Sequence, residues 1–277
     1  MNNLTPSFDV EKLYADIESG TVKLPPMPDW VFKIQRMLDD MNVSTDQIVA
    51  TVSRDPTFVA QLFKSANSAA YAGKPKVNTA KAAISRLGFK ALRNLVMAIS
   101  MNNLSKTNNP TVGKFLSAFW LHSREVAAIS YLLSKSQRHL NQDQAMLAGL
   151  IHDIGTLPLC INAGKMFPNI SENDLSSIVI KYSAQVSEKM LQEWGFPPEM
   201  SVIPIAHENL QIQNDSGLSN YADIVTIANL LNRVTAKTVN WESISAVQRL
   251  GLDVQIYQEF FERFEEDITS ARSMLEV

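Results

Sequence analysis

Residues 147–155 read Leu-Ala-Gly-Leu-Ile-His-Asp-Ile-Gly, and the interpretation of the whole chain starts from this stretch. It is an apolar helical segment that carries His152 and Asp153 side by side and is broken by Gly155. Adjacent helical residues point about 100° apart, so one face cannot present both, whereas near a helix end both can lean toward one point. Imidazole and carboxylate groups are ligands for divalent cations. The alternative is a buried histidine whose ring N–H is held by the aspartate.

Other histidines accompany this stretch in a recognisable order. His122 lies upstream on another helical pattern, His207-Glu208 follows downstream, and residues 221–231 open a further helix. This order resembles the HD superfamily of all-α metal-dependent phosphohydrolases.

Short motifs in the N-terminal half narrow the resemblance to the HDOD family (HD-related output domain). The resemblance runs from about Leu24 to about Leu231, and the joint order of the motifs is more specific than any one of them. It implies an all-α, multi-helix HD-like fold and a regulatory role. The motifs are Leu24-Pro25-Pro26-Met27-Pro28, Asp55-Pro56, Ala66-Asn67-Ser68-Ala69-Ala70-Tyr71, Ile84-Ser85-Arg86-Leu87-Gly88 and Leu92-Arg93.

Helix signals recur along the chain and strand signals do not, which predicts an all-α protein. We expect an N-terminal helical lobe packed on a degenerate HD-like helical lobe, with polar residues 102–110 as the boundary. The expected parts are an N-terminal helical extension at 1–23, an HDOD-like domain at 24–231 with lobes 24–105 and 110–231, and C-terminal helices at 232–277 packed on the HD-like lobe.

Several helix starts are predicted from capping residues. Pro28 suits the first position of a helix, and Ser44 with Gln47 forms a capping-box signature. Asp55 before Pro56 is a typical helix start, and Asn78 is a candidate cap for a helix that ends near Gly88.

Composition indicates a soluble, cytoplasmic protein, and the HDOD resemblance implies a bacterial one. Of its 277 residues 45% are hydrophobic, which is ordinary for a globular chain. Cys160 is the only cysteine, so no internal disulfide can form and a reducing cytosol fits. The first twenty residues lack a signal-peptide core, and we expect no apolar run near the roughly 20 residues that span a bilayer.

The net charge of −3 is unevenly distributed. No acidic residue lies between Asp55 and Glu125, whereas ten basic residues do, which indicates either an anionic partner or charges scattered over solvated helix faces. Arg86, Lys90 and Arg93 would line one side if the helix continued through Gly88. The predicted binding residues are Asn67, Ser68, Tyr71, Lys74, Lys76, Arg86, Lys90 and Arg93.

The HD resemblance implies a ligand set of histidine, His-Asp and a distant aspartate. His122 and the His152-Asp153 pair match the first two. The expected Ala-Asp dipeptide aligns best with Ala228-Asn229, whose amide is a poorer cation ligand than a carboxylate. A competing alignment places it at Ala222-Asp223.

Other residues implied by the active relatives are also replaced. Ser183 and Ala206 stand where dinuclear relatives have histidines, and Thr156 stands where a lysine often follows the His-Asp pair. Phosphoester hydrolysis needs metals to activate water and neutralise phosphate oxygens. We therefore expect no metal and no cofactor, and a buried hydrogen-bonded cluster that holds helices together. Its members would be His122, His152, Asp153, His207 and Asn229.

The functional prediction is a non-catalytic bacterial signal-transduction module that acts through a protein partner or a small anionic ligand such as a nucleotide. The alternative is a metal-dependent phosphohydrolase for a nucleotide or cyclic dinucleotide, with His122, His152 and Asp153 as ligands to a divalent metal. Nucleic-acid binding is disfavoured by a pI near 5.8 and by the lack of a reading motif. No membrane association is expected.

Overall fold

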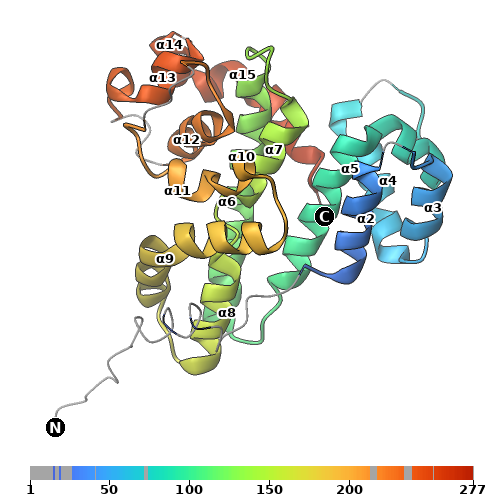
Figure 1. Cartoon of the computed structure of the whole chain (residues 1–277), viewed down its shortest axis with the longest axis horizontal. Helices are drawn as coiled ribbons and strands as arrows, with labels where there is room; N and C mark the ends of the chain where they lie inside the picture. The colour runs from blue at the N-terminus through green and yellow to red at the C-terminus, as the bar shows by residue number, and fades with distance from the viewer. Residues whose placement is uncertain are drawn as a thin grey trace.

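The chain folds as an assembly of helices in two lobes (Figure 1). No β-strand occurs among the residues that the computed structural model describes, in agreement with the predicted all-α class. The predicted extension at 1–23 lies almost wholly outside them. The described residues are 15, 19, 27–40, 42–71, 74–212, 217–233, 239–251 and 253–276.

The N-terminal lobe is built around α5 (Ala80–Leu104). Three short helices pack against it: α2 (Asp29–Asp39), α3 (Thr45–Val52) and α4 (Pro56–Ala66). A 3-10 turn, η1 (Ala69–Tyr71), follows α4. Each helix buries one apolar stripe, as the sequence periodicity predicts.

The predicted caps are mostly correct. Ser44 and Gln47 form the capping box of α3, and the Asp55 carboxylate accepts two backbone N–H groups at the start of α4. Two predictions are wrong by one residue. Pro28 has extended backbone and is the N-cap of α2 rather than its first helical residue, and Thr79 rather than Asn78 caps α5.

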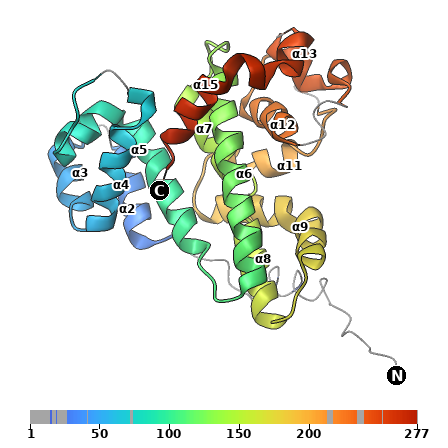
Figure 2. The same cartoon turned by 180° about the vertical axis from the view of Figure 1, so that it is seen from behind.

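A kink at Gly88 divides α5. Gly88 has φ 77° and ψ 168°, which is outside the helical region and favours glycine. The part of α5 after the kink is almost entirely buried from Leu92 to Met101 and packs against α7. This part therefore joins the two lobes (Figure 2).

The second lobe has α6 (Pro110–Ser134) and α7 (Gln142–Ile151) at its centre, with α12 (Tyr221–Asn232) packed on both. A Cβ atom on Gly149 of α7 would lie 2.7–2.8 Å from Ser130 Oγ, Ala127 Cα and Val126 O of α6. Only a glycine allows the two helices to approach this closely.

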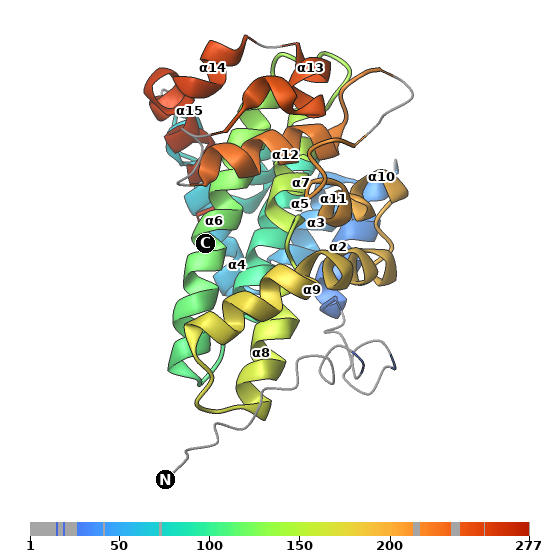
Figure 3. The same ribbon diagram turned by 90° about the vertical axis from the view of Figure 1, so that its left-hand side faces the viewer.

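Helices α8 (Thr156–Met166) and α9 (Glu172–Glu193) complete this lobe (Figure 3). The short helices α10 (Pro198–Ser201) and α11 (Ile203–Ala206) lead from α9 toward α12. Both contact α9 and α12, so the segment after α9 is fixed over the lobe.

The C-terminal segment connects the two lobes. It comprises η3 (Trp241–Ser243), α13 (Ser245–Leu250), α14 (Val254–Gln258) and α15 (Phe260–Ser273). Helix α15 lies along α6 and also contacts η1 (Figure 2). The Ser65 hydroxyl of α4 donates to the Met274 carbonyl at 2.8 Å, so these residues tie the chain end to the N-terminal lobe.

Residues 142–166 are long and apolar enough to cross a membrane by length and composition alone, contrary to the expectation that no such run exists. In the fold they form α7 and α8, separated by the break at 152–155, and 83% of the apolar window is buried inside the protein. This segment is the core of the second lobe.

Candidate functional site

Three histidines and one aspartate converge where α6, α7 and the end of α11 meet. His122 is carried by α6, His152 and Asp153 follow the last residue of α7, and His207 follows α11. The Nε2 atoms of His122 and His152 are 3.3 Å apart, and His152 Nε2 is 3.2 Å from Asp153 Oδ2. His207 Nε2 lies 4.0 Å from Asp153 Oδ1. The structure thus places four of the five predicted cluster residues around one point.

The orientation of each ring is fixed from its other side. His152 Nδ1 lies 2.8 Å from the Gly149 carbonyl, and His207 Nδ1 lies 3.1 Å from the Ile203 carbonyl. His122 Nδ1 lies 2.6 Å from Asn232 Oδ1. Because these oxygens can only accept, each Nδ1 must donate its hydrogen. Each neutral ring therefore turns an Nε2 lone pair toward Asp153.

The aspartate and the rings perturb one another's protonation. Burial favours the neutral form of Asp153, but the charge and hydrogen bond of His152 hold the pKa of its carboxyl well below the usual range. Burial opposes the charging of His152, yet the Asp153 charge and hydrogen bond raise the pKa of His152 above its ordinary value. Burial, and then the charge of His152, lower the pKa of His207 and bring that of His122 down to about 4. Of the three rings, His152 is therefore the one that takes up a proton most readily.

Asn229, the fifth predicted member, lies one turn before Asn232 on α12, on the same side of the helix. It is buried, and its Oδ1 has no hydrogen-bond partner among the described residues. The competing aspartate is used elsewhere. Asp223 accepts hydrogen bonds from Arg249 Nε at 2.9 Å and from Nη2 at 2.5 Å, so the structure rules out the alignment that made it a site residue.

The positions where active relatives carry basic residues are filled by small hydroxyl groups. Thr156 Oγ1 and Ser183 Oγ are 2.9 Å apart and both residues are buried. The Ser187 hydroxyl accepts the Gly155 N–H at 2.8 Å. These bonds connect α8 to α9 behind Asp153 and leave no cation there.

The cluster is reached from the surface through a cavity of about 370 Å³. Asp153 lies at its inner end, where its side chain is 19% exposed, and Glu208 lies beside it with Oε1 3.4 Å from His207 Nε2. Lys181 and Arg233 also line this cavity. Sequence reasoning missed Asn232 and Arg233, because only the fold shows that the end of α12 reaches the cluster, and it named Glu208 beside His207 without giving it a role in the site.

The donor atoms form two groups of three that could each hold a divalent cation: His122 with His152 and Asp153, and Asp153 with His207 and Glu208. Each histidine Nδ1–H is anchored to an oxygen, as is usual for metal-bound histidines. His207 Nε2 and Asn229 Oδ1 are buried without hydrogen-bond partners among the described residues. Asp153 would be the ligand that the two groups share. The expectation that the cluster is metal-free stays a prediction.

The eight predicted binding residues do not form one surface. The condition that α5 runs straight through Gly88 is not met, and the kink separates Arg86 from Lys90 and Arg93. Arg86 donates to the backbone carbonyls of Ala66 and Pro75, so it holds the loop after α4 in place.

The other members of this set divide in the same way. Asn67 binds the backbone N–H and carbonyl of Val77, and Lys74 lies over the ring of Tyr71. Ser68 Oγ is buried without a partner among the described residues, and Lys76 is exposed. These residues shape the loop after α4, whereas Lys90 and Arg93 line a separate cleft between the lobes.

The basic window, the acid-free stretch of residues 56–124, is also partly neutralised. Lys64, Lys81, Arg93 and Lys114 form ion pairs with Glu276, Asp46, Asp39 and Glu172, all from outside the window. The hypothesis that these basic residues form one extended positive surface is therefore weakened.

Comparison with known proteins gives one family and a set of similar folds. The model of the HDOD domain family matches residues 24–210. A protein of Treponema pallidum (strain Nichols), called uncharacterized, is 23% identical over 74% of this chain. The chain spans 42% of the length of that relative.

Three solved structures share the fold. A proposed metal-dependent phosphohydrolase from Shewanella amazonensis SB2B has a TM-score of 0.81 at 22% identity, covering 96% of this chain and 98% of its own. An HDOD domain protein of Geobacter sulfurreducens, with unknown function, has a TM-score of 0.70 at 21% identity, with 97% and 100% covered. A proposed signal transduction protein of Marinobacter aquaeolei VT8 has a TM-score of 0.63 at 22% identity, with 96% and 65% covered.

Proposed function

Because the chain belongs to the HDOD domain family, we propose that it is a non-catalytic bacterial signalling module that acts through a protein partner or a small anionic ligand. The similar fold of the proposed signal transduction protein of Marinobacter aquaeolei VT8 is compatible with this role. A regulatory module needs a stable scaffold with binding surfaces, and the two-lobed helical fold provides one.

The observation that carries the proposal is the shortage of charged groups at the cluster. The position of the distant aspartate that the HD resemblance implies holds Asn229, whose amide is neutral. Thr156 and Ser183, which bond to each other, occupy positions where basic groups would contact a phosphate. Hydrolysis of a phosphoester requires activated water and neutralised phosphate oxygens, and this site supplies little of either.

In this proposal the cluster has a structural role and holds several helices together. It joins α6, α7 and the end of α11, and the His122–Asn232 bond adds α12. Buried polar groups that bond across helices favour a single arrangement of the elements that carry them. The surfaces that meet a partner are then held in one geometry.

The test combines metal analysis with activity assays on protein purified without chelator. We expect less than one equivalent of Mn, Fe, Zn or Mg, and no release of product from cyclic dinucleotides or nucleoside phosphates. Full occupancy by one of these metals, together with turnover that is lost in Asp153→Ala, would overturn the proposal.

The second candidate is a metal-dependent phosphohydrolase, favoured by the convergence of three Nε2 lone pairs on Asp153. A bound divalent cation would supply Lewis-acid activation of water. His122, His152 and Asp153 would hold it, and Lys181 and Arg233 in the adjoining cavity would attract an anionic substrate.

A substitution at Asn229 separates the two candidates. If the amide at this position is what limits the site, Asn229→Asp should raise metal occupancy and create or increase turnover. Asn229→Ala is the matched control, because it removes the amide without adding a charge. Equal and negligible turnover in wild type and both variants supports the non-catalytic role.

A further inference from the structure

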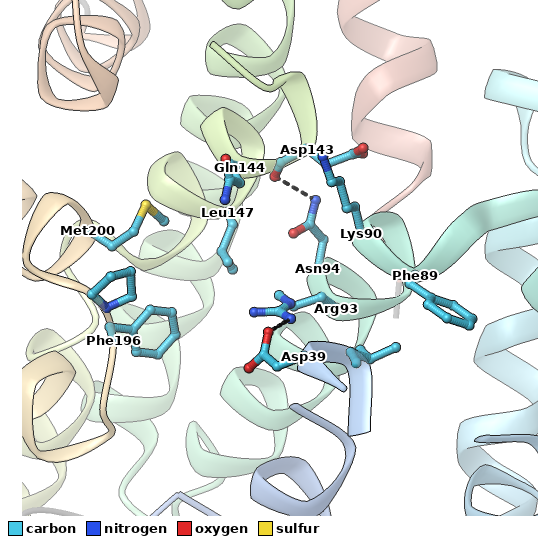
Figure 4. A pocket seen from close by; sticks show the side chains of 12 residues that line it. Asp39, Phe89, Lys90, Arg93, Asn94, Asp143, Gln144, Leu147, Phe196 and Met200 are labelled. Atoms are coloured by element: carbon cyan, nitrogen blue, oxygen red, sulfur yellow. Dashed lines mark hydrogen bonds and ion pairs between the residues drawn. The ribbon is translucent and has the colours of Figure 1, made fainter. Parts of the chain in front are cut away.

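A second cavity, of about 450 Å³, lies between the two lobes and does not include the histidine cluster. Its walls come from α2 and α5 of the N-terminal lobe, from α7, and from the segment around α10 (Figure 4). A volume of this size is within the range of small-molecule sites.

One wall of this cavity is apolar. Leu147 of α7 and Met200 of α10 are buried core residues whose side chains line the cavity, and Phe196 adds an aromatic ring (Figure 4). A planar ring placed against Phe196 would gain both apolar contact and stacking. This wall therefore suits the ring of a heterocycle.

Two amide groups of fixed orientation lie beside that wall. Asn94, which is only 2% exposed, donates from Nδ2 to the Asp143 carbonyl at 3.0 Å, which leaves its Oδ1 as an acceptor facing the cavity (Figure 4). Gln144 Oε1 accepts the Tyr221 hydroxyl at 2.6 Å, which leaves its Nε2 as a donor. One donor and one acceptor match the edge of a nucleobase, which offers the opposite pair.

Two basic groups of α5 lie across the cavity from Phe196 and Met200 (Figure 4). The Arg93 guanidinium reaches toward the centre of the cavity, with one Nη2 bond to Asp39 and its other N–H groups available (Figure 4). Lys90 has no ion-pair partner among the described residues. Asp39 and Asp143 balance these charges formally, so the cavity suits a ligand with a single phosphate better than a polyanion.

We propose that the cleft between the lobes binds a nucleoside monophosphate, with the base against Phe196 and the amides of Asn94 and Gln144, and the phosphate at Lys90 and Arg93. This binding site deepens the proposed function, and its regulatory meaning rests on that function. The cleft shares α7 with the histidine cluster, since Asp143, Gln144 and Leu147 lie on the helix that ends at His152. A ligand there would bridge both lobes and stabilise one arrangement of them.

Isothermal titration of the full chain tests this assignment with GMP and AMP, with guanosine and adenosine as the matching nucleosides that lack the phosphate, and with ribose 5-phosphate as the part that lacks the base. We expect at least one of the two nucleotides to bind about tenfold or more tightly than its nucleoside or ribose 5-phosphate, because base and phosphate contacts act together. No binding of GMP or AMP, or equal binding of ribose 5-phosphate, would overturn the assignment.

Two exposed residues locate the site without disturbing the core. Lys90→Ala removes a phosphate contact, and Gln144→Glu adds a negative charge while keeping the acceptor for Tyr221. Each should weaken nucleotide binding by roughly fivefold or more. Lys76→Ala, which replaces an exposed lysine of the same lobe outside the cleft, is the matched control and should bind as wild type.

Unchanged binding in both cleft variants places the ligand elsewhere and refutes the site. Failure of nucleotide binding leaves the metal and hydrolysis tests unaffected, so the two proposals fail separately.

Discussion

The Nε2 atoms of His122 and His152 face each other at 3.3 Å, although the Nδ1–H of each ring already donates to an oxygen on its far side. Two lone pairs cannot be neighbours in a buried site without a positive charge between or beside them. A proton on His152 or a bound cation satisfies the pair. The cluster is therefore a centre that requires one cation, whichever kind it holds.

Loss of Asp153 should destabilise the fold because the carboxylate balances that cation. Asp153→Ala leaves the His152 ring without its partner, and we expect a loss of roughly 1–3 kcal/mol in the free energy of unfolding. His152→Ala should cost a similar amount. Urea unfolding of metal-free protein measures both, with Glu193→Ala, an exposed residue at the end of α9, as control. Unchanged unfolding curves for Asp153→Ala and His152→Ala would show that the pair is not structural.

Acidification should destabilise the protein through His122. Its pKa is lowered to about 4 by burial and by His152, so between pH 6.5 and 4 the unfolded chain binds a proton that the folded chain does not. Stability attributable to His122 is therefore present above pH 6.5 and lost as the pH falls toward 4. His207 has the same sign. His152, whose pKa is raised, has the opposite sign: its contribution is present at acidic pH and is lost as the pH rises above its ordinary range.

Urea unfolding at pH 6, 5 and 4 measures this slope. Wild type should lose roughly 1–3 kcal/mol across the range. In His122→Gln the slope should be smaller, because one of the two groups has been removed. A slope that is the same in both proteins would contradict the assignment to His122.

The contact of α6 and α7 should not tolerate a side chain at position 149. A Cβ there would lie 2.7 Å from Ser130 Oγ and 2.8 Å from backbone atoms of Ala127 and Val126, and backbone cannot move aside as a side chain can. We expect Gly149→Ala to destabilise by roughly 1–3 kcal/mol, as overpacking does. Gly113→Ala, whose Cβ would meet only Thr107 Cγ2 at 3.7 Å, is the control and should be near neutral.

The helices were predictable because their signals are local. Ser44 with Gln47 and Asp55 with Pro56 specify helix starts within four residues, and the apolar periodicity specifies buried faces. The order of His122, the His152-Asp153 pair and His207 was informative because the family resemblance supplied their meeting point.

What was not predictable depends on contacts between distant segments. Arg86 and Arg93 look equivalent in the sequence, but Gly88 takes φ 77° between them and sends one to a loop and the other to the cleft. The opposite wall of the cleft includes Phe196, more than a hundred residues away in another lobe. No periodicity relates such residues before the chain is folded.

The last prediction concerns Asp223, which the sequence offered as a possible site residue and the fold uses as a buried ion-pair partner. Its carboxylate binds Arg249 Nε and Nη2 and also accepts the Asn220 N–H, while its side chain is only 1% exposed. Removing one partner of a buried pair strands the other, so Arg249→Met should destabilise by roughly 3–5 kcal/mol. Asp223→Asn keeps the shape but loses the charge and should have a smaller effect of the same sign. The double variant should be less destabilised than the sum of the two, because no charge is left unpaired. Urea unfolding of the four proteins gives the coupling energy. Additive losses would show that the two side chains act independently and would contradict the pairing of Asp223 with Arg249.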